Sequence, residues 1–346
     1  MKHILLVDDN LANLKLASNL LKDYYKVSLT KSGMQALEFC KKNRPDLILL
    51  DINMPDMDGF ETIKALKNNI ATRNIPVIFL TASNESEVEA KGFEYGAVDF
   101  ITKPFAKKSM LHRIETHLQL FDYQLHLEYV VKELEDSIIT SFCELIECRD
   151  NETGGHIERT KEYVRLIANE LRAAGKYTDI LSDYYIEMLV RSAPLHDIGK
   201  IGIRDIVLLK PARLTDEEFE EMKKHTLIGE EVLNTIMKRM PSQKYLDIAK
   251  EIAASHHERF DGEGYPNRLK GNDIPLSARI VSAADVYDAL ITDRVYREAM
   301  PHEKACELIL SGKGKQFDPD VIDAFMNIEE KIYEVSKSIR EDSLLK

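Results

Sequence analysis

Short apolar runs alternate with amphipathic stretches through the first hundred residues. The runs are almost continuously apolar, which is typical of strands that are buried on both faces of a sheet. Between them, apolar residues recur at helical spacing. This alternation predicts a doubly wound α/β domain with a five-stranded parallel sheet over residues 1–106. The expected strands are 4–7, 26–30, 46–52, 76–83 and 99–102, and the expected helices are 11–22, 34–43, 59–69 and 85–95.

A stretch without proline or glycine follows, from Ser109 to Asp150. Its apolar residues recur every three or four positions, slip near Glu128 and then resume, which predicts a long connecting helix over 107–140. Two interpretations stay open. The helix joins two copies through a coiled-coil seam, or it packs as a single amphipathic helix on its own domain. The seam positions are Leu111, Ile114, Leu118, Phe121, Leu125, Val131, Leu134, Ile138, Phe142 and Leu145.

The remaining chain, residues 141–346, has helical periodicity almost throughout and no strand-like runs. We therefore expect an all-α bundle for this part, closed by a C-terminal helix. The fold class is thus multidomain, with an α/β domain, a connecting helix and a helical domain. The expected helices of the bundle are 156–174, 183–196, 215–238, 243–257, 277–291 and 302–311.

Composition narrows the range of partners. The formal net charge is -12, which argues against binding to nucleic acid backbones. No apolar run is long enough to span a membrane, and the N-terminus lacks the features of a signal peptide. We expect a cytoplasmic protein without membrane insertion. Its four cysteines form no CxxC pair and are expected to be reduced thiols of a cytosolic protein rather than a disulfide framework. These cysteines are Cys40, Cys143, Cys148 and Cys306.

Polar residues follow the predicted strands of the first domain. Because the carboxyl ends of parallel strands share one edge of a sheet, these side chains are expected to converge. Clustered carboxylates repel one another unless a cation neutralises them, and oxygen ligands suit Mg²⁺. The residues concerned are Asp8 and Asp9, Asp51, Thr81, and Lys103 with Pro104.

This set resembles the receiver domain of two-component response regulators over residues 2–106. The resemblance implies that Asp51 accepts a phosphoryl group from a cognate histidine kinase, and that the bond from Lys103 to Pro104 can be cis. The implied Mg²⁺ site consists of Asp8, Asp9, Asp51 and the backbone carbonyl of Asn53. The implied switch residues are Thr81, Lys103 and Phe100, the last standing where the family often has tyrosine.

The helical part carries five histidines interleaved with carboxylates in the segments ETGGH, HDIGK, KKHTLIG, SHH and AADVYDAL. Burying such a set unpaired would be expensive, so a metal centre explains it better than a structural role. Mixed nitrogen and oxygen ligation favours Fe, Mn, Co or Zn over Mg or Ca. The candidate ligands are Glu152, His156, His196, Asp197, His225, His256, His257 and Asp285.

HDIGK (196–200) together with HHERFDGEGYP (256–266) resembles the HD-GYP subclass of HD-domain phosphohydrolases, over residues 141–330. The resemblance implies hydrolysis of cyclic di-GMP to linear pGpG, and often onward to GMP. It implies two or three metal ions, often iron and with manganese as an alternative. The eight candidate ligands match the family's positions, and Glu152 matches the one associated with a third ion.

Further roles follow from position. Asp197, Lys200 and Asp288 are the candidate catalytic residues, and Lys200 is also a candidate substrate contact. Lys200 lies one helical turn past His196 and so within reach of the same phosphate or the leaving group. Asp288 is expected to orient a ligand, Lys200 or the base, and is also a candidate substrate contact. Arg294 and Arg297 resemble positions that meet the nucleotide. In the GYP loop, Gly262 and Gly264 suit tight turns or positive φ, and Tyr265 is expected to pack rather than react.

The leading hypothesis is a dimeric cyclic-di-GMP phosphodiesterase controlled by phosphorylation, with a GGDEF-type protein as a further candidate partner. A second hypothesis keeps the chemistry on another cyclic dinucleotide, such as cyclic GMP-AMP. A third is a signalling adaptor that binds nucleotide or protein without turnover. Loss of metal ligands would favour the adaptor, and the sequence retains every expected ligand.

Overall fold

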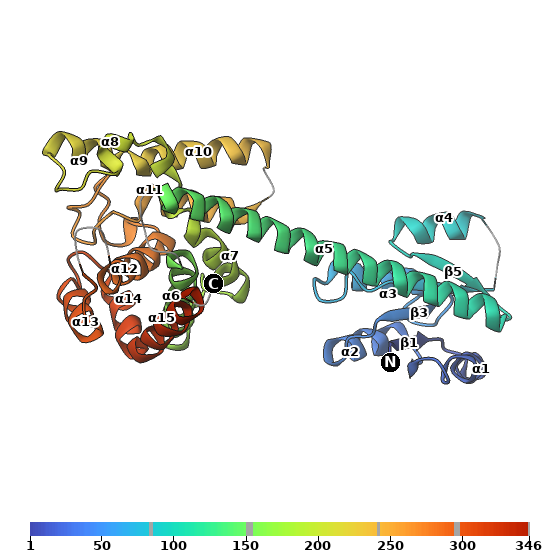
Figure 1. The fold of residues 1–346 in the computed structure, drawn as a ribbon. Coiled ribbons are helices and arrows are strands. Elements are labelled where there is room, and N and C mark those ends of the chain that lie inside the picture. The colour runs from blue at the N-terminus through green and yellow to red at the C-terminus, as the bar shows by residue number, and fades with distance from the viewer. Residues whose placement is uncertain (83–85, 150–154, 241–242, 294–297, 345–346) are drawn as a thin grey trace. The chain divides into compact units, whose positions relative to one another are not determined.

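The computed structural model of the chain describes residues 1–82, 86–149, 155–240, 243–293 and 298–344. The chain forms two compact units, Met1–Lys132 and Glu133–Lys346, and helix α5 (Lys107–Arg149) runs from the first into the second (Figure 1). Among the described residues, no helix combines the length and apolar character needed to cross a membrane.

The N-terminal unit is a parallel five-stranded sheet in the order β2-β1-β3-β4-β5, which confirms the predicted doubly wound fold. The expected strand over 76–83 ends earlier, at Thr81, because its neighbour β5 ends at Thr102, the residue paired with Thr81. The strands are β1 (His3–Val7), β2 (Lys26–Thr30), β3 (Leu47–Asp51), β4 (Val77–Thr81) and β5 (Asp99–Thr102). The helices before α5 are α1 (Leu11–Leu21), α2 (Gly33–Lys42), α3 (Gly59–Asn68) and α4 (Ser86–Glu94).

Side chains of this sheet alternate between two cores. Ile4 and Leu6 belong to a core completed by α1 and by the first turns of α5, whereas Leu5 and Val7 belong to one completed by α2 and α3. All four residues are fully buried. Burial on both faces explains why the strands are continuous apolar runs, and it leaves only the carboxyl edge of the sheet for polar groups.

The two halves of the apolar seam of helix α5 differ in how deeply their side chains are buried. Ile114 and Leu118 are buried in the core that contains Ile4 and Leu6, so the first turns of α5 pack on the N-terminal unit. Further along, Leu134 and Ile138 are 59% and 60% exposed. The single-helix interpretation therefore holds for the first turns of α5, and the coiled-coil interpretation stays a prediction for the later ones.

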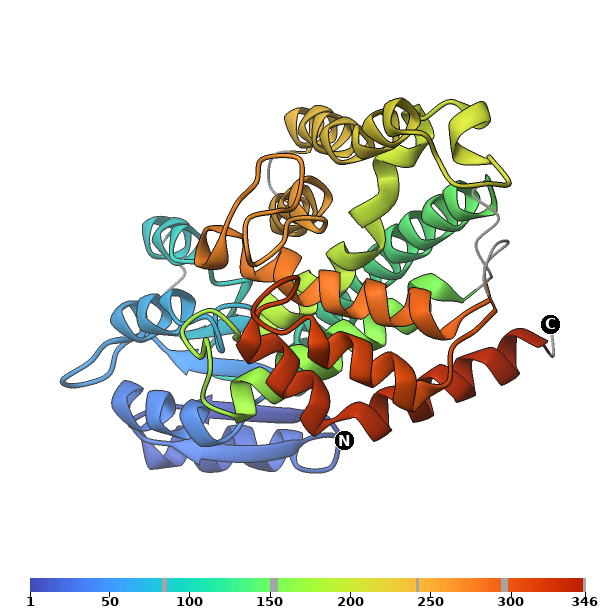
Figure 2. The same ribbon diagram turned by 90° about the vertical axis from the view of Figure 1, so that its left-hand side faces the viewer.

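The second unit is helical, as predicted (Figures 1 and 2). Its larger core is built by α6, α7 and α12 to α15, and a second core joins the end of α5 to η1, α10 and α11. The elements are α6 (His156–Ala173), α7 (Asp183–Ser192), the 3₁₀ helix η1 (Ala193–Gly202), α8 (Asp205–Leu208), α9 (Asp216–Lys223), α10 (His225–Arg239), α11 (Lys244–Ser255), the 3₁₀ turn η2 (Gly271–Asp273), α12 (Leu276–Ile291), α13 (His302–Ser311), α14 (Pro319–Asn327) and α15 (Glu329–Leu344).

Two expected helices are each divided. The segment 183–196 is α-helical only to Ser192 and continues as η1, which begins with Ala193 and Pro194. The segment 215–238 breaks at Lys224 into α9 and α10. Both divisions occur where a predicted metal ligand must be aimed, since η1 carries HDIGK and α10 begins at His225.

Candidate metal centre and pocket

Seven of the eight predicted metal ligands come together in two adjoining groups. In each group, one ligand atom from every member lies within 4.8 Å of the others. The eighth, Glu152, lies outside the described residues, as do Arg294 and Arg297. The first group is Asp197, His225, His256 and His257, and the second is His156, His196 and Asp285.

The carboxylate of Asp197 connects the two groups. Its Oδ1 is 3.3 Å from Nε2 of His225 and 3.6 Å from Nε2 of His256, whereas its Oδ2 is 3.4 Å from Nε2 of His196. Two ligands that each stand about 2.1 Å from one ion are roughly 3.4 Å apart at a tetrahedral angle. The spacing therefore suits two neighbouring ions that share Asp197.

Backbone carbonyls orient three of the imidazoles. Nδ1 of His196 hydrogen-bonds to the carbonyl of Ala193 at 2.9 Å, and Nδ1 of His225 to that of Met222 at 2.8 Å. Nδ1 of His256 makes the same contact with Ile252 at 3.0 Å, one turn back along α11. Because Nδ1–H is the donor in each case, Nε2 carries the lone pair that a metal requires, and it faces the centre.

Protonation of the centre follows from burial and from the carboxylates. Burial lowers the pKa of His225 to about 4 and places that of His257 well below its usual value, so both rings are neutral. Burial also lowers the pKa of His196, but the neighbouring Asp197 and Asp285 outweigh it and raise the pKa to about 10. The half of the centre beside Asp285 thus favours positive charge, which a metal ion supplies in place of a proton.

The donor set fits transition metals. Nε2 of His196 and Oδ1 of Asp197 are buried and lack a hydrogen-bond partner among the described residues. Buried polar atoms without partners are costly, and ion coordination removes that cost. Imidazole nitrogens with carboxylate oxygens favour Fe, Mn, Co or Zn.

Gly199 allows the HDIGK segment to reach its partners. A Cβ at Gly199 would lie 1.8 Å from the carbonyl oxygen of His225 and 2.5 Å from the amide nitrogen of Gly229. Only glycine permits the backbones of η1 and α10 to approach this closely. The contact brings Asp197 and His225, which come from different helices, to one ion site.

The position of Lys200 corrects its expected geometry. In a 3₁₀ helix, residues three apart share a face, so Lys200 lies over Asp197 rather than one turn past His196. Its Nζ is 2.8 Å from Oδ2 of Asp197, and its side chain is largely buried. The ammonium therefore stands beside the carboxylate that joins the two groups of ligands.

Asp288 lies behind the centre. Its Oδ2 is 2.8 Å from Nδ1 of His156, and its two oxygens accept hydrogen bonds from Arg159 at 2.7 and 2.8 Å. Both side chains of the Asp288–Arg159 pair are 1% exposed. Of the roles expected for Asp288, orienting a ligand fits this placement, whereas contact with a substrate does not. Arg159 was not among the predicted site residues, because its partner is 129 positions away.

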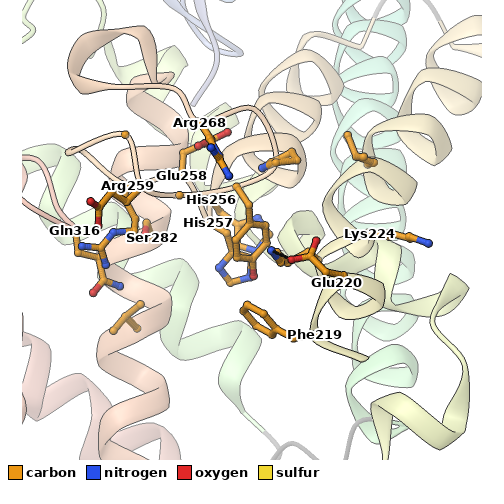
Figure 3. Close-up of a pocket in the computed structure, with 18 residues that line it drawn as sticks. Phe219, Glu220, Lys224, His256, His257, Glu258, Arg259, Arg268, Ser282 and Gln316 are labelled. Carbon is orange, nitrogen blue, oxygen red and sulfur yellow. Dashed lines mark hydrogen bonds and ion pairs between the residues drawn. The ribbon is translucent and has the colours of Figure 1, made fainter. Parts of the chain in front are cut away.

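A pocket of about 850 Å³ adjoins the first group of ligands (Figure 3). His257 and Phe219 face it in the figure, with Arg259, Ser282 and Gln316 on the side opposite Lys224. The wall is rich in cations and aromatic rings, which suits a ligand with phosphates and flat bases.

The GYP loop forms one wall of this pocket. The ring of Tyr265 lies 4.8 Å from that of His257, at an interplanar angle of 30°, as expected for a packing role. Of the tight turns or positive φ expected for the loop glycines, Gly262 shows a positive φ of 86°, and Gly264 lies outside the positive-φ region. Gly264 instead allows close approach, since a Cβ there would lie 2.3 Å from the amide nitrogen of Arg259.

Glu258 holds the same loop, and the motif gave no reason to select it. It is 3% exposed, and its two oxygens accept hydrogen bonds from the amides of Asn267 at 2.7 Å and Leu269 at 3.1 Å. A buried carboxylate that binds amides nine and eleven positions on fixes the ends of the loop to each other. The wall next to His257 is therefore held in place by Glu258.

The receiver residues converge as expected at the carboxyl edge of the sheet. Asp8, Asp9 and Asp51 form an acidic group, and Nζ of Lys103 lies 2.7 Å from Asp8 and 2.9 Å from Asp51. The Lys103–Pro104 bond is cis. Burial raises the pKa of Asp51, against the opposing effect of Lys103 and of a hydrogen bond from the amide of Asn53.

Two of the three expected switch residues, Thr81 and Phe100, lie on neighbouring strands. Thr81 ends β4 and is 4% exposed, and Phe100 on β5 is 6% exposed. The ring of Phe100 packs against Phe79 and Phe93, with ring centroids 5.6 and 5.0 Å away. This inward position leaves the role of Phe100 as a switch a prediction.

A further group of side chains of metal-binding type lies elsewhere among the described residues of the helical unit. It consists of His302, Cys306 and Glu329. The sulfur of Cys306 is 3.6 Å from Nδ1 and 3.7 Å from Nε2 of His302, so it lies on the lone-pair axis of neither nitrogen. This is a buried thiol packed on an imidazole, and we assign no metal to it.

Comparison with known proteins agrees with this arrangement. Residues 4–115 match the response regulator receiver domain, and residues 144–321 match the HD domain. A probable cyclic di-GMP phosphodiesterase of Vibrio cholerae serotype O1 is 44% identical over 98% of this chain and 80% of its own length. The cyclic di-GMP phosphodiesterase response regulator RpfG of Xanthomonas campestris pv. campestris is 34% identical over 94% of this chain and 87% of its own.

A more distant relative has another substrate in its name. The 3′3′-cGAMP-specific phosphodiesterase 2 of Vibrio cholerae serotype O1 is 35% identical over 60% of this chain and 39% of its own length. The receiver match implies binding of Mg²⁺, and the HD match implies a divalent-metal-dependent phosphohydrolase. The chain therefore belongs to the response regulators that join an N-terminal receiver domain to a C-terminal HD domain of the HD-GYP type.

Proposed function

We propose that the protein is a metal-dependent cyclic-di-GMP phosphodiesterase whose activity responds to phosphorylation of Asp51. The observation that carries the proposal is the pair of ligand groups joined by Asp197 beside a pocket of about 850 Å³. Relatives named as cyclic di-GMP phosphodiesterases match nearly the whole chain, receiver included. Hydrolysis of one phosphodiester bond gives linear pGpG, and of the second, GMP.

The chain's own residues account for the site's selectivity for a phosphodiester. The two ligand groups joined by Asp197 would hold metal ions, which when bound would supply hydroxide near neutral pH and neutralise charge on the phosphoryl oxygens. Lys200 stands 2.8 Å from Asp197 and is placed to stabilise the phosphate or the departing 3′ oxygen. Asp288 keeps Nε2 of His156 aimed at the centre. The wall formed by Tyr265 and Phe219 limits how the bases can lie.

We assign iron to the centre, with manganese as the alternative, and two ions to the seven described ligands. Glu152, four residues before His156, is the proposed ligand of a third ion. Arg294 and Arg297 are retained as proposed nucleotide contacts. Metal analysis of protein prepared without oxygen tests the metal assignments, with a Glu152 variant for the third ion. Single variants of Arg294 and Arg297 test the nucleotide contacts through KM.

The proposed partners follow from the domains. A receiver domain implies a histidine kinase as phosphoryl donor. The exposed apolar positions of α5, such as Leu134 and Ile138, support a homodimer through the later turns of this helix. A GGDEF-type partner and a cytoplasmic location complete the proposal. Light scattering of the full chain and of Ile138→Lys tests the dimer, since a charge in the seam should favour monomer.

The similarity to a cyclic GMP-AMP phosphodiesterase supports that nucleotide as a second candidate substrate. An adaptor role has less support, because seven of the proposed metal ligands lie in two adjoining groups. The deciding experiment supplies iron- or manganese-loaded protein with both nucleotides in competition, without oxygen. We expect faster loss of cyclic di-GMP, with pGpG as first product. Failure to hydrolyse either nucleotide would remove the proposed function.

A pair of matched variants distinguishes loss of the metal site from a general effect of replacing a histidine. His256→Ala combined with His257→Ala should abolish turnover and reduce bound metal. His112→Ala, an exposed histidine on α5, should leave both unchanged. Full metal content and activity in the double variant would show that the ligands are wrongly assigned.

A further inference from the structure

The last residue of α5 makes an unusual set of contacts with the catalytic segment. Arg149 donates hydrogen bonds to the carbonyls of Lys200 at 3.2 Å, Ile201 at 3.0 Å and Ile203 at 2.7 Å. The same guanidinium binds Oδ1 of Asp205 at 3.0 and 2.6 Å. One side chain thus joins the end of α5 to the end of η1 and the start of α8.

The 3₁₀ helix needs such support. Runs of 3₁₀ helix longer than three or four residues are uncommon because their hydrogen bonds have poorer geometry, and η1 has 10 residues. The carbonyls of a last helical turn lack partners inside the helix, and a nearby arginine can satisfy them. Arg149 binds the carbonyls of Ile201 and Ile203, and it adds a second donor to the carbonyl of Lys200, which also accepts from the amide of Ile203 at 3.1 Å.

The contacts of Arg149 reach the site through the backbone of Lys200. The carbonyl of this residue is bound by Arg149, and its ammonium lies 2.8 Å from Asp197. Other residues of α5 also lie against η1. Cys143, Ile146 and Glu147 line one small cavity together with Asp197, Ile198 and Lys200.

We propose that Arg149 is a positioning residue for the phosphodiesterase reaction: it sets the last turn of η1, and through it Lys200 and Asp197, relative to the end of α5. The inference rests on the proposed function. Arg149 is not among the residues that line the pocket, and its contacts with this segment are to the carbonyls of Lys200, Ile201 and Ile203, so it acts through the backbone of the last turn of η1. Arg149 ends α5, so a shift of the last turns of this helix would reach η1 through Arg149 as well as through Cys143 and Ile146.

The test compares the full chain with Arg149→Ala and Arg149→Lys after metal loading. We expect kcat on cyclic di-GMP to fall about 10- to 100-fold in Arg149→Ala, as for residues that orient a metal site from behind, with KM and bound metal nearly unchanged. Lysine keeps the charge but cannot bridge three carbonyls, so the kcat of Arg149→Lys should lie between those of the wild-type chain and Arg149→Ala. Equal losses of metal and activity, or no loss of kcat, would overturn the proposal.

A second readout does not depend on the substrate. Hydrogen exchange of the amides over 193–203 should be faster in Arg149→Ala than in the wild-type chain. The matched control is Arg172→Ala, since Arg172 also lies in the last turn of a helix and binds a carbonyl, that of Leu181, away from the centre. Exchange over 193–203 that is unchanged in Arg149→Ala would contradict the inference. If the wild-type chain did not hydrolyse cyclic di-GMP but Arg149→Ala still showed faster hydrogen exchange over 193–203, the proposed function would be wrong while the contact of Arg149 with η1 would stand.

Discussion

The backbones of Gly199 and His225 are in such close contact that a methyl group on Gly199 would lie 1.8 Å from the carbonyl oxygen of His225. The contact is between two main chains, so no rotamer change can relieve it. It sets the distance between η1, which carries Asp197, and α10, which begins with His225. A glycine without any catalytic group thereby determines whether two metal ligands can share an ion.

Gly199→Ala should therefore impair the metal centre. We expect the backbones to separate, bound metal and turnover to be largely lost, and the unfolding free energy to fall by about 1–3 kcal/mol, as for an overpacked core. Metal analysis and thermal unfolding check this. The control is Gly202→Ala, whose Cβ would meet only the movable side chain of Ile228 at 3.0 Å. Wild-type metal content in Gly199→Ala would show that the close contact is dispensable.

Asp288→Asn should weaken metal binding from a distance. The change leaves Arg159 without its buried counter-charge and His156 without the carboxylate that orients it. Removing one partner of a buried ion pair costs about 3–5 kcal/mol of stability, and metal affinity should fall roughly 10- to 100-fold. Urea unfolding and metal titration measure the two effects. Asp323→Asn is the control, because it removes only an exposed pair with Lys313. Equal behaviour of both variants would contradict the assigned role.

Tyr265→Ala should affect substrate more than metal. The ring packs on His257 and lines the pocket but offers no ligand atom to the centre. We expect KM for cyclic di-GMP to rise with little change in bound metal, and Tyr265→Phe to behave like the wild-type chain, because packing needs the ring and not its hydroxyl. The exposed Tyr184 supplies the control, as Tyr184→Ala. Steady-state kinetics decide, and an unchanged KM in Tyr265→Ala would exclude the loop wall from binding.

Phosphorylation at Asp51 should change the rate. Beryllofluoride with Mg²⁺ mimics an acyl phosphate on the carboxylate, which Lys103 already contacts at 2.9 Å. We expect kcat to differ with and without this reagent in the wild-type chain and to be unaffected in Asp51→Asn. Asp23→Asn, an exposed change elsewhere in the receiver unit, should respond as the wild-type chain does. Identical wild-type rates would show that the receiver does not control the centre.

The sequence predicted the parts of the molecule whose signal is local. Strands buried on both faces appear as apolar runs, so the receiver sheet was predictable, apart from the end of β4. The predicted site residues of the second domain lie in short motifs such as HDIGK, and seven of the eight predicted ligands lie together in the structure. Their identity came from residue type and resemblance, and did not depend on knowing the local helix geometry.

The residues that the sequence did not reveal act through distant partners. Arg159 meets Asp288 from 129 positions away, and Arg149 caps η1 from about fifty. An apolar pattern of this length is similar in α and 3₁₀ helices, so the placement of Lys200 over Asp197 was missed. The signals that existed were Pro194 and the two glycines of HDIGKIG, which are poor α-helix formers.

The most direct test of the shared centre is one sample of full-length protein, loaded with Fe²⁺ or Mn²⁺ without oxygen and measured for both metal content and turnover of cyclic di-GMP. The arrangement around Asp197 predicts at least two ions per chain and formation of pGpG, and it predicts that Asp197→Ala loses both metal and turnover. A chain that binds two ions and leaves cyclic di-GMP intact, or an Asp197→Ala variant that still hydrolyses it, would contradict the account.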